Sequence, residues 1–300
     1  QGMYACNQQI KISGRVLRIA RLDADKYRFL LDPEPLIAEL RASGERIDLF
    51  TFLQGLHETE PKYKYPMELD NLAVLPVSTF DNWWDKQIGF KARNKAKQAG
   101  KNGVVIREIP FDARLARGIW EIYNEVPVRQ GRRFPHYGKD LDAVYAEEAT
   151  YLDSSTFIGA FRGDELIGFI KLVVDEAGMQ AGLMNIVSKI AHRDAAPTNA
   201  LVAQAVRFCA ERKIQYLVYS NFAYGNKERD GLSDFKTRNG FTKVGIPRYY
   251  VPLTAFGWTA FRLGLHCRLA ERFPEPVARR LREVRNNWYN RKFPSKREAS

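Results

Sequence analysis

Apolar and polar positions alternate along the chain in a pattern that becomes regular after residue 103. Helical spacing and apolar runs predict the order β, α, α, β, β, β, α, β, α, β over residues 103–254. Gly163 and Asp164, between two apolar runs, predict a β-hairpin. The expected strands lie at 103–110, 155–162, 165–175, 180–189, 214–222 and 241–254, and the expected helices at about 113–125, 140–152, 197–213 and 231–239.

Prolines and glycines limit several of these elements. Pro197 suits the first turn of the helix that it opens, and Gly240 ends the helix before it. Pro247 predicts a bulge or an edge position in the last strand, because proline cannot donate to a ladder of hydrogen bonds.

The two ends of the chain differ from this regular part. Residues 1–80 mix one expected strand at 11–20 with a helix at 35–43 and two apolar runs, 47–53 and 72–77, which together predict a small α+β region. One helix is expected over 81–101, and residues 255–300 are expected to be helical, aromatic and basic. We therefore divide the chain into an N-terminal region 1–80, a central domain 81–254 and a tail 255–300.

Composition is that of a globular chain, with 45% hydrophobic and 27% charged residues. It has neither a run of eighteen apolar residues nor the regions of a secretory signal, so we expect a cytoplasmic protein. The three cysteines lie far apart and the four histidines have no ligand spacing, which predicts neither a disulfide framework nor a metal site.

The net charge of +12 is concentrated in two places. Residues 256–300 hold eleven Lys or Arg and four acids, a net +7, with arginines alternating with aromatic residues. Such helices can lie on an anionic membrane surface or bind a polyanion; alternatively, the aromatic stripe packs on the domain and the arginines stay in water. A second run contains no acid and predicts a positive face: Lys86, Lys91, Arg93, Lys95, Lys97, Lys101 and Arg107.

The element order over residues 103–254 resembles the fold of the GCN5-related N-acetyltransferases (GNAT). This resemblance implies an α+β fold with a mixed, mainly antiparallel sheet flanked by helices. In that family a loop of the form Gln/Arg-x-x-Gly-x-Gly/Ala precedes a helix whose N–H groups hold the pyrophosphate of coenzyme A. Residues 193–198, RDAAPT, occupy the six places.

The resemblance implies acetyl-CoA or another acyl-CoA as the donor and no metal. It places the donor phosphates near Arg193, Ala196, Thr198 and Asn199. Here both glycines of the loop are replaced, and Pro197 removes one N–H donor. The alternative is an ordinary strand-to-helix turn in which Thr198 or Asn199 caps the helix.

Further polar residues match the reaction that the family performs. In FKTRNGF at 235–241, Lys236 stands where the family often has a tyrosine that protonates the leaving thiolate, and it could donate a proton or steady negative charge. It could equally be a solvated lysine. Asn185, Ser188, Ser220 and Asn221 could polarise the thioester carbonyl, a catalytic role expected first of Asn185, or hold the pantetheine amides. Ordinary polar positions of strands would look the same.

The loop PVRQGRRFPHYGK lies where this fold gates its acceptor groove. Arginine forks suit carboxylate or phosphate groups, so an acidic acceptor is expected there, although a solvated basic loop would look the same. His136 is a candidate base, with Asp175 and Glu176 as alternatives that suit turn chemistry. The substrate-binding candidates are Arg129, Arg132, Arg133 and Tyr137.

Lys236, together with the basic stretch KARNKAKQAGKNGV, is similar to the Fem-type and BioF2-like branch of the superfamily. That branch includes peptidoglycan aminoacyltransferases that draw on aminoacyl-tRNA. Fem-type enzymes usually carry two such domains, and the N-terminal 80 residues are too short for a complete second one.

The sequence therefore predicts an acyl-CoA-dependent N-acyltransferase. Its acceptor would be an amine of a small molecule or of a cell-envelope or polysaccharide precursor. Two alternatives stay open: a Fem-type aminoacyltransferase with aminoacyl-tRNA as its only nucleic acid, and a non-catalytic module that binds a polyanion or membrane. The tail, in either case, could make peripheral contact with the inner face of the membrane.

Overall fold

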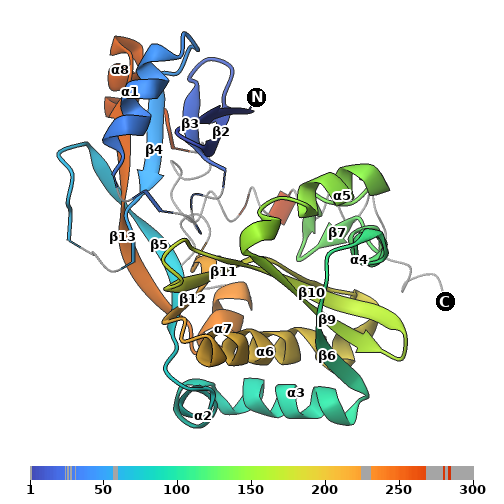
Figure 1. Cartoon of the computed structure of the whole chain (residues 1–300). Helices are drawn as coiled ribbons and strands as arrows, with labels where there is room; N and C mark the ends of the chain where they lie inside the picture. Colours follow the sequence, from blue (N-terminus) through green and yellow to red (C-terminus); the bar gives the residue numbers. More distant parts are fainter. Residues whose placement is uncertain are drawn as a thin grey trace.

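The computed structural model describes residues 2–267 except positions 24, 26, 28, 31, 57–59 and 224–230, and beyond residue 267 only positions 280, 283 and 284. Eleven strands of this part form one sheet in the order β1-β2-β3-β4-β13-β5-β12-β11-β10-β9-β6 (Figure 1). Neighbouring strands are antiparallel except β3 with β4 and β11 with β12. The expected α+β class, with a mixed, mainly antiparallel sheet flanked by helices, is confirmed.

The N-terminal elements form the upper lobe in Figure 1, together with the last described helix. The strands of this lobe enclose a core that includes Phe50, Phe52 and Tyr249. Leu36 and Leu40 of the helix at 34–42 pack on this core. The elements are β1 Gly2–Ala5, β2 Gln8–Ser13, β3 Ile19–Leu22, α1 Glu34–Ala42, β4 Leu49–Leu53, β5 Met67–Pro76 and α8 Ala255–Arg262.

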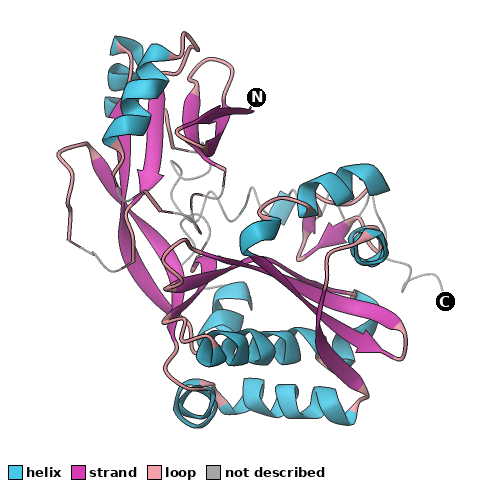
Figure 2. Cartoon of the chain, in the orientation of Figure 1, coloured by secondary structure: helices cyan, strands magenta, loops and turns pink. Residues whose placement is uncertain are grey.

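The remaining elements form the lower lobe, in which helices cover both faces of the sheet (Figure 2). Helices α3, α6 and α7 lie below the sheet in this view, and α4 and α5 lie above it (Figure 1). The elements up to the hairpin are α2 Phe80–Asn82, the π-helical η1 Trp83–Gln87, α3 Phe90–Lys101, β6 Val104–Ile109, α4 Ala113–Tyr123, β7 Val128–Arg129, β8 Arg132–Arg133, α5 Leu141–Glu148 and η2 Leu152–Ser154. After them come β9 Ser155–Arg162, β10 Glu165–Val174, β11 Gln180–Ser188, η3 Ile190–Ala195, α6 Pro197–Glu211, β12 Tyr216–Asn221, α7 Gly231–Arg238 and β13 Thr242–Pro252.

The starts of α4 and α5 follow from side-chain caps. Asp112 accepts a hydrogen bond from the Leu115 amide and Asp140 from the Ala143 amide, both at 2.7 Å, so the first turns of α4 and α5 are capped. The apolar face of α4 then packs with α5 onto β9 and β10 in a core that includes Ile119, Ile122 and Phe169.

Three sequence expectations are wrong in detail. The strand expected at 11–20 is two strands, β2 and β3, joined by a turn in which Gly14 has a φ of +95°. The helix expected at 81–101 breaks at Ile88 and Gly89, because the Gly89 amide donates to the carbonyl of Arg238 at 2.8 Å. A Cβ at Gly89 would lie 3.2 Å from that carbonyl oxygen, so glycine allows the close approach.

Pro247 marks neither a bulge nor an edge. It pairs with Leu69 in an unbroken register between β13 and β5, and β13 lies inside the sheet. On its other side, the last partner of β13 in β4 is Leu53, opposite Arg248, and the Pro247 carbonyl accepts from the Gln54 amide at 3.0 Å. The missing N–H therefore falls where β4 has already ended and removes no ladder bond.

The sheet runs without interruption through the predicted boundary at residue 80. Strand β5, from the N-terminal region, lies between β12 and β13 of the central region. The division into 1–80, 81–254 and 255–300 stays a prediction. In the tail, helix α8 is as expected, whereas the residues from Arg268 onward lie outside the described part apart from 280, 283 and 284.

Candidate functional site

Strands β11 and β12 part after a short parallel pairing. They pair only from Gln180 opposite Tyr216 to Gly182 opposite Val218; beyond that point β11 continues with β10 while β12 continues with β5. We call this opening the fork. Where two neighbouring strands separate, the opening between them can take an extended ligand.

Tyr27 covers one side of the fork. Its ring is buried against Gly182, where an added Cβ would lie 1.9 Å from the ring carbon Cδ1. The Tyr27 hydroxyl donates to the Leu183 carbonyl at 3.0 Å, and the Gln180 side-chain amide donates to the Tyr27 carbonyl at 3.2 Å. The N-terminal region thus contributes to the site, which the sequence pattern did not indicate.

The start of α6 lies beyond the far end of β11. Ala196 has a φ of +55° and no side chain caps the first turn of α6, whose first residue, Pro197, has no N–H. Ala196 and Asn199 are buried, and the Thr198 hydroxyl is 2.7 Å from the Ser188 hydroxyl. The structure therefore brings together four of the seven residues expected to bind the donor: Ser188, Ala196, Thr198 and Asn199.

Arg193 lies on η3, exposed, and contacts no described residue through an ion pair or hydrogen bond of its side chain. The Asn199 amide is bound to the Ala196 carbonyl at 3.1 Å. With Pro197 lacking an N–H, this leaves few amides at the helix start for a phosphate group.

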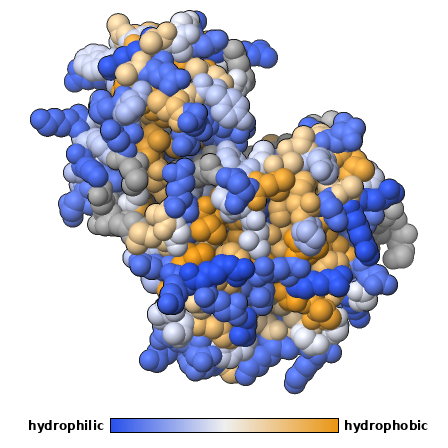
Figure 3. Space-filling view, viewed as in Figure 1, coloured by the Kyte–Doolittle hydropathy of each residue, from blue (hydrophilic) through white to orange (hydrophobic). Residues whose placement is uncertain are grey.

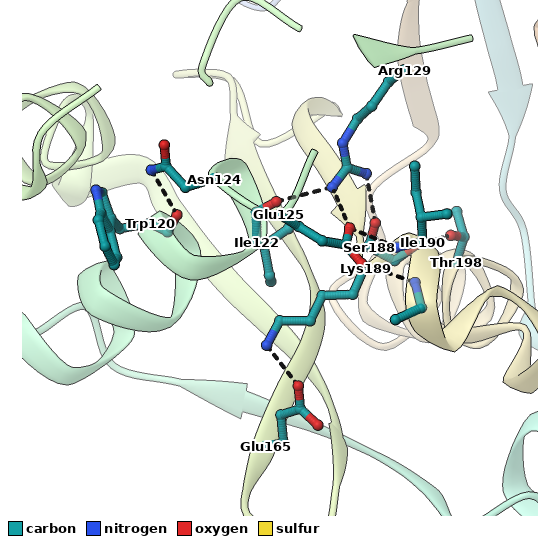
Figure 4. A network of polar contacts seen from close by, with 11 residues as sticks. Trp120, Ile122, Asn124, Glu125, Arg129, Glu165, Ser188, Lys189, Ile190 and Thr198 are labelled. Carbon is teal, nitrogen blue, oxygen red and sulfur yellow. Dashed lines mark hydrogen bonds and ion pairs between the residues drawn. The ribbon is translucent and has the colours of Figure 1, made fainter. Parts of the chain in front are cut away.

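The Glu125 side chain binds two backbone amides in the segment before α6 (Figure 4). The Glu125 carboxylate accepts from the Ile190 amide at 2.7 Å and from the Ala191 amide at 2.8 Å. It also accepts from Arg129 at 3.0 Å. The end of α4 is thereby fastened to the segment that follows β11.

Arg129 contributes more to this network than to a substrate site. Its two terminal nitrogens donate to the carbonyls of Ser188 at 2.7 Å and Ile122 at 2.9 Å as well as to Glu125 (Figure 4). Burial lowers the pKa of Arg129 from its usual value, against the opposing effect of Glu125. Because both terminal nitrogens are engaged within the protein, we propose that Arg129 positions the end of α4 against the segment after β11 instead of binding a substrate directly.

The other acceptor-loop candidates differ in exposure, and His136 alone among them is part-buried. Arg132, Arg133 and Tyr137 are exposed. His136 stacks on Tyr123, with ring centres 4.2 Å apart, and its Nδ1 lies 3.4 Å from Glu147. Hydrogen bonds from His136 and Lys139 lower the pKa of Glu147 to about 2.

Asn185 joins a buried polar cluster that sequence reasoning missed. Its amide donates to both oxygens of Glu148, at 2.9 and 3.1 Å, and the Tyr123 hydroxyl donates to the same carboxylate at 2.7 Å. The buried Lys171 donates to the carbonyls of Glu148 and Thr150 at 2.8 and 2.7 Å. The lone lysine in the apolar run ELIGFIKLVVD was the one signal of this cluster in the sequence.

Burial governs the titration of this cluster. It raises the pKa of Glu148, against the opposing hydrogen bonds from Tyr123 and Asn185, and it lowers the pKa of Lys171. It also raises the pKa of Tyr123 well above its usual value. The cluster lies between α5 and the sheet, on the α4–α5 side.

Lys236 is a buried residue of α7, the helix on the opposite side of the sheet (Figure 1). Its Nζ donates to the carbonyl of Asn221 at the end of β12 and lies 4.4 Å from the centre of the Tyr219 ring. Ser220, between those two residues, has a φ of +47°, and the pairing of β12 with β5 shifts register there. The catalytic candidates therefore form two groups: His136 and Asn185 are connected through Tyr123 and Glu148, and Lys236 lies apart from them.

The Asn221 side chain connects this end of β12 to the upper lobe. It donates to Asp70 at 3.0 Å, and Asp70 accepts from Arg248 at 2.9 Å. Arg248 also donates to Asp25 at 2.8 Å, in the same segment as Tyr27. Figure 3 shows the surface hollowed between the two lobes, with apolar side chains gathered on the lower lobe beside the hollow.

The fold of the chain is similar to that of known structures. No protein-family model matches the chain, and no curated protein matches it. The C-terminal domain of a protein described as a lysylphosphatidylglycerol synthetase from Agrobacterium fabrum is 13% identical, with a TM-score of 0.57 over 87% of this chain and 86% of that one. The L-PGS structure from Bacillus licheniformis is 13% identical, with a TM-score of 0.56 over 88% and 87% of the two chains.

FemX, at 12% identity, gives a TM-score of 0.53 over 85% of this chain and 86% of its own. The chain thus has a GNAT-type, Fem-like fold, as the resemblance predicted. The likeness also covers much more than the 150 residues that carried the sequence resemblance. None of the described helices is long and apolar enough to cross a membrane.

Proposed function

We propose that this chain transfers an acyl or aminoacyl group from an activated donor to an amine. The observation that carries the proposal is the fork, where β11 and β12 stop pairing after Gly182 and Val218. The opening between the separating strands suits an extended donor, and an activated carbonyl held there lies between the two helical layers.

The chemistry requires little from side chains. The acceptor amine attacks the donor carbonyl carbon, a C–N bond forms, and the bond to the leaving sulfur or oxygen breaks. The amine loses a proton and the leaving atom gains one. We assign Lys236, which reaches the end of β12 from α7, to steadying the leaving atom, and Asn185 to polarising the carbonyl.

Acyl-CoA is the first candidate donor. Its phosphates would lie at the start of α6, near Ala196, Thr198, Asn199 and Ser188, with Arg193 as an exposed cation. Ser220 and Asn221 would face the pantetheine from β12. The acceptor, an amine of a small molecule or an envelope precursor, would approach past Arg132, Arg133 and Tyr137.

Aminoacyl-tRNA is the second candidate donor, and the surface of α3 favours it. Lys91, Lys95 and Lys101 are exposed and form no ion pair with any residue that the structure describes, and Phe90 beside them is 69% exposed. A positive face with an exposed ring suits a nucleic acid. The fold's likeness to FemX is consistent with this donor.

Donor binding is tested by thermal shift and calorimetry with acetyl-CoA, and by tRNA binding over a range of salt concentrations. An acyl-CoA enzyme is stabilised by acetyl-CoA, and Arg193→Ala weakens this effect whereas the exposed Arg114→Ala does not. An aminoacyl-tRNA enzyme binds tRNA with a steep salt dependence that falls by about one unit of slope for each lysine removed from Lys91, Lys95 and Lys101. Replacing Lys64, Lys213 and Lys243 changes the net charge equally and serves as the control.

Turnover is tested separately with Lys236→Met. Loss of a group that steadies the leaving atom should lower donor consumption about 100-fold while donor binding stays unchanged. The exposed Lys243→Met is the matched control. A chain that binds polyanions but consumes neither donor would be the non-catalytic module, and the transferase proposal would then be wrong.

A further inference from the structure

Three potential metal ligands meet at the side of β13, away from the fork. Glu68 comes from the start of β5, and His266 and Cys267 follow α8. The His266 Nε2 atom lies 3.0 Å from a Glu68 carboxylate oxygen and 3.4 Å from the Cys267 sulfur, and the three ligand atoms all lie within 4.8 Å of one another. We propose that these side chains bind a Zn²⁺ ion or a similar thiolate-binding divalent metal.

The spacing suits tetrahedral coordination. Zinc binds nitrogen at about 2.0 Å, carboxylate oxygen at about 2.1 Å and sulfur at about 2.3 Å, so neighbouring ligand atoms lie roughly 3.3–3.7 Å apart. The two short separations in this cluster are within a few tenths of an ångström of that range. An ion would need small movements, chiefly of Glu68, whose side chain is 47% exposed.

The histidine is held in place by its surroundings. Only 3% of its side chain is exposed, and its ring stacks on Phe261 at a centre-to-centre distance of 4.6 Å, with Tyr250 at the same distance on another side. The backbone at 264–267 is a tight turn after α8, in which the Cys267 amide donates to the Gly264 carbonyl at 3.1 Å. A ligand that is already ordered loses little freedom when a metal binds.

The ligand types select the metal. A thiolate with an imidazole favours Zn²⁺ over Mg²⁺ or Ca²⁺, which prefer oxygen ligands alone. Three protein ligands leave a fourth position for water or a further group. The buried Nδ1 of His266 has no hydrogen-bond partner among the described residues, and such partners commonly raise metal affinity 10–100-fold. We therefore expect weaker binding than at a fully supported zinc site.

Sequence spacing could not indicate this site, and the sequence predicted no metal at all. Glu68 lies 198 residues before His266, and they meet because β5 and the segment after α8 both lie against β13. A metal here would join the end of the upper lobe's last helix to the sheet. It would constrain the chain over a long loop and stabilise the folded state.

The test uses the full chain, stripped of metal with a chelator, and titrates Zn²⁺ by calorimetry and Co²⁺ by absorption spectroscopy. The unmodified chain should bind one ion per chain at this site and give a thiolate-to-Co²⁺ charge-transfer band. Cys267→Ser should abolish that band, and Glu68→Gln should weaken Zn²⁺ binding at least 10-fold. Glu68 is half exposed, so the second variant should fold even if the first does not.

Two controls come from the chain itself. The Nε2 atom of His192 lies 3.1 Å from a Glu165 carboxylate oxygen, a similar pair for which the structure describes no cysteine ligand. His192→Gln should therefore leave Zn²⁺ binding unchanged. Cys6→Ser removes an exposed thiol elsewhere and should leave the Co²⁺ band unchanged. A band that survives Cys267→Ser, or Zn²⁺ binding that Glu68→Gln leaves intact, overturns the proposal.

Discussion

Two residues beside the fork adopt backbone conformations that their side chains disfavour. Ala196 at the start of α6 and Ser220 near the end of β12 both have positive φ, at +55° and +47°. A residue with a Cβ in the left-handed region costs about 1–2 kcal/mol relative to glycine-like freedom. Both strained positions lie where the proposed donor would bind, which is where such strain is commonly found.

Ala196→Gly should therefore raise the free energy of unfolding by about 0.5 kcal/mol, because the relief of strain exceeds the added freedom of the unfolded chain. Urea denaturation measures the change. Ala146→Gly, at an exposed position inside α5, is the matched control and should lower it by about 1 kcal/mol. Equal losses in both variants would show that the conformation at Ala196 carries no strain.

Two adjacent glutamates titrate in opposite directions. Burial raises the pKa of Glu148, so the folded state binds a proton more tightly than the unfolded state, and this contribution to stability is lost as pH rises above about 4.5. The pKa of Glu147 is lowered from 4.5 to about 2, so its contribution is present above pH 4.5 and lost as pH falls toward 2.

We expect Glu148→Gln to become more stable relative to the unmodified chain as pH rises from 4 to 7. Glu147→Gln should show the reverse. We expect this variant to lose about 1 kcal/mol of stability at pH 7, after allowance for solvent screening of this part-exposed group, and the loss should shrink below pH 4.5. Urea denaturation across this pH range measures both. Parallel pH profiles for the two variants would contradict the opposite shifts.

At the scale of elements, the sequence predicted the helices and turns that depend on residues close together in the chain. The hairpin at Gly163, the helix opening at Pro197 and the order after residue 103 depend on short-range spacing. All are confirmed, except that the loop expected between the first two helices contains the short strand pair β7–β8. The break at Gly89 depends on Arg238, 149 positions away, and the cover of the fork depends on Tyr27 meeting Gly182. Contacts of that range leave no periodic trace in the sequence.

Separation along the sequence also decides which residues of the candidate site could be predicted. Lys236 and the residues before α6 were found because a loop and a helix in the sequence resemble a known pattern. Glu148 and Lys171 were missed, because a buried polar group is recognisable only once its partners are known. Whether the candidates act as proposed stays a prediction.

Tyr27 and Gly182 test the geometry of the fork. Gly182→Ala would place a Cβ 1.9 Å from the Tyr27 ring, so we expect a loss of about 2 kcal/mol of stability as the ring is displaced. Gly245→Ala, on β13 with its nearest neighbour at 3.9 Å, should change stability little. In Tyr27→Ala the effect of Gly182→Ala should largely disappear; simple additivity would contradict the contact.

At the scale of the whole molecule, the sheet joins regions that the sequence separates. Strand β5 is the partner of both β12 and β13, and β4 also pairs with β13. A chain that begins at residue 81 would leave β13 without either neighbour and expose the buried Tyr249 and Val251.

We therefore expect the 81–300 fragment to show no cooperative thermal unfolding by circular dichroism, whereas the full chain shows it. The reason is the loss of two strand pairings and of the core packed on them. Cooperative unfolding of the fragment, with dispersed amide signals in NMR spectra, would instead support residues 1–80 as a separate unit.

The strand order also bears on how the protein is made. The middle of the sheet, β4-β13-β5-β12, takes two strands from before residue 77 and two from after residue 215. During translation β4 has only β3 as a partner and β5 has none until β12 follows, and the gap between β4 and β5 stays open until the ribosome has released residue 252. Completion of the protein's centre is thus a late event of synthesis, and nascent chains stalled before that point should depend on chaperones.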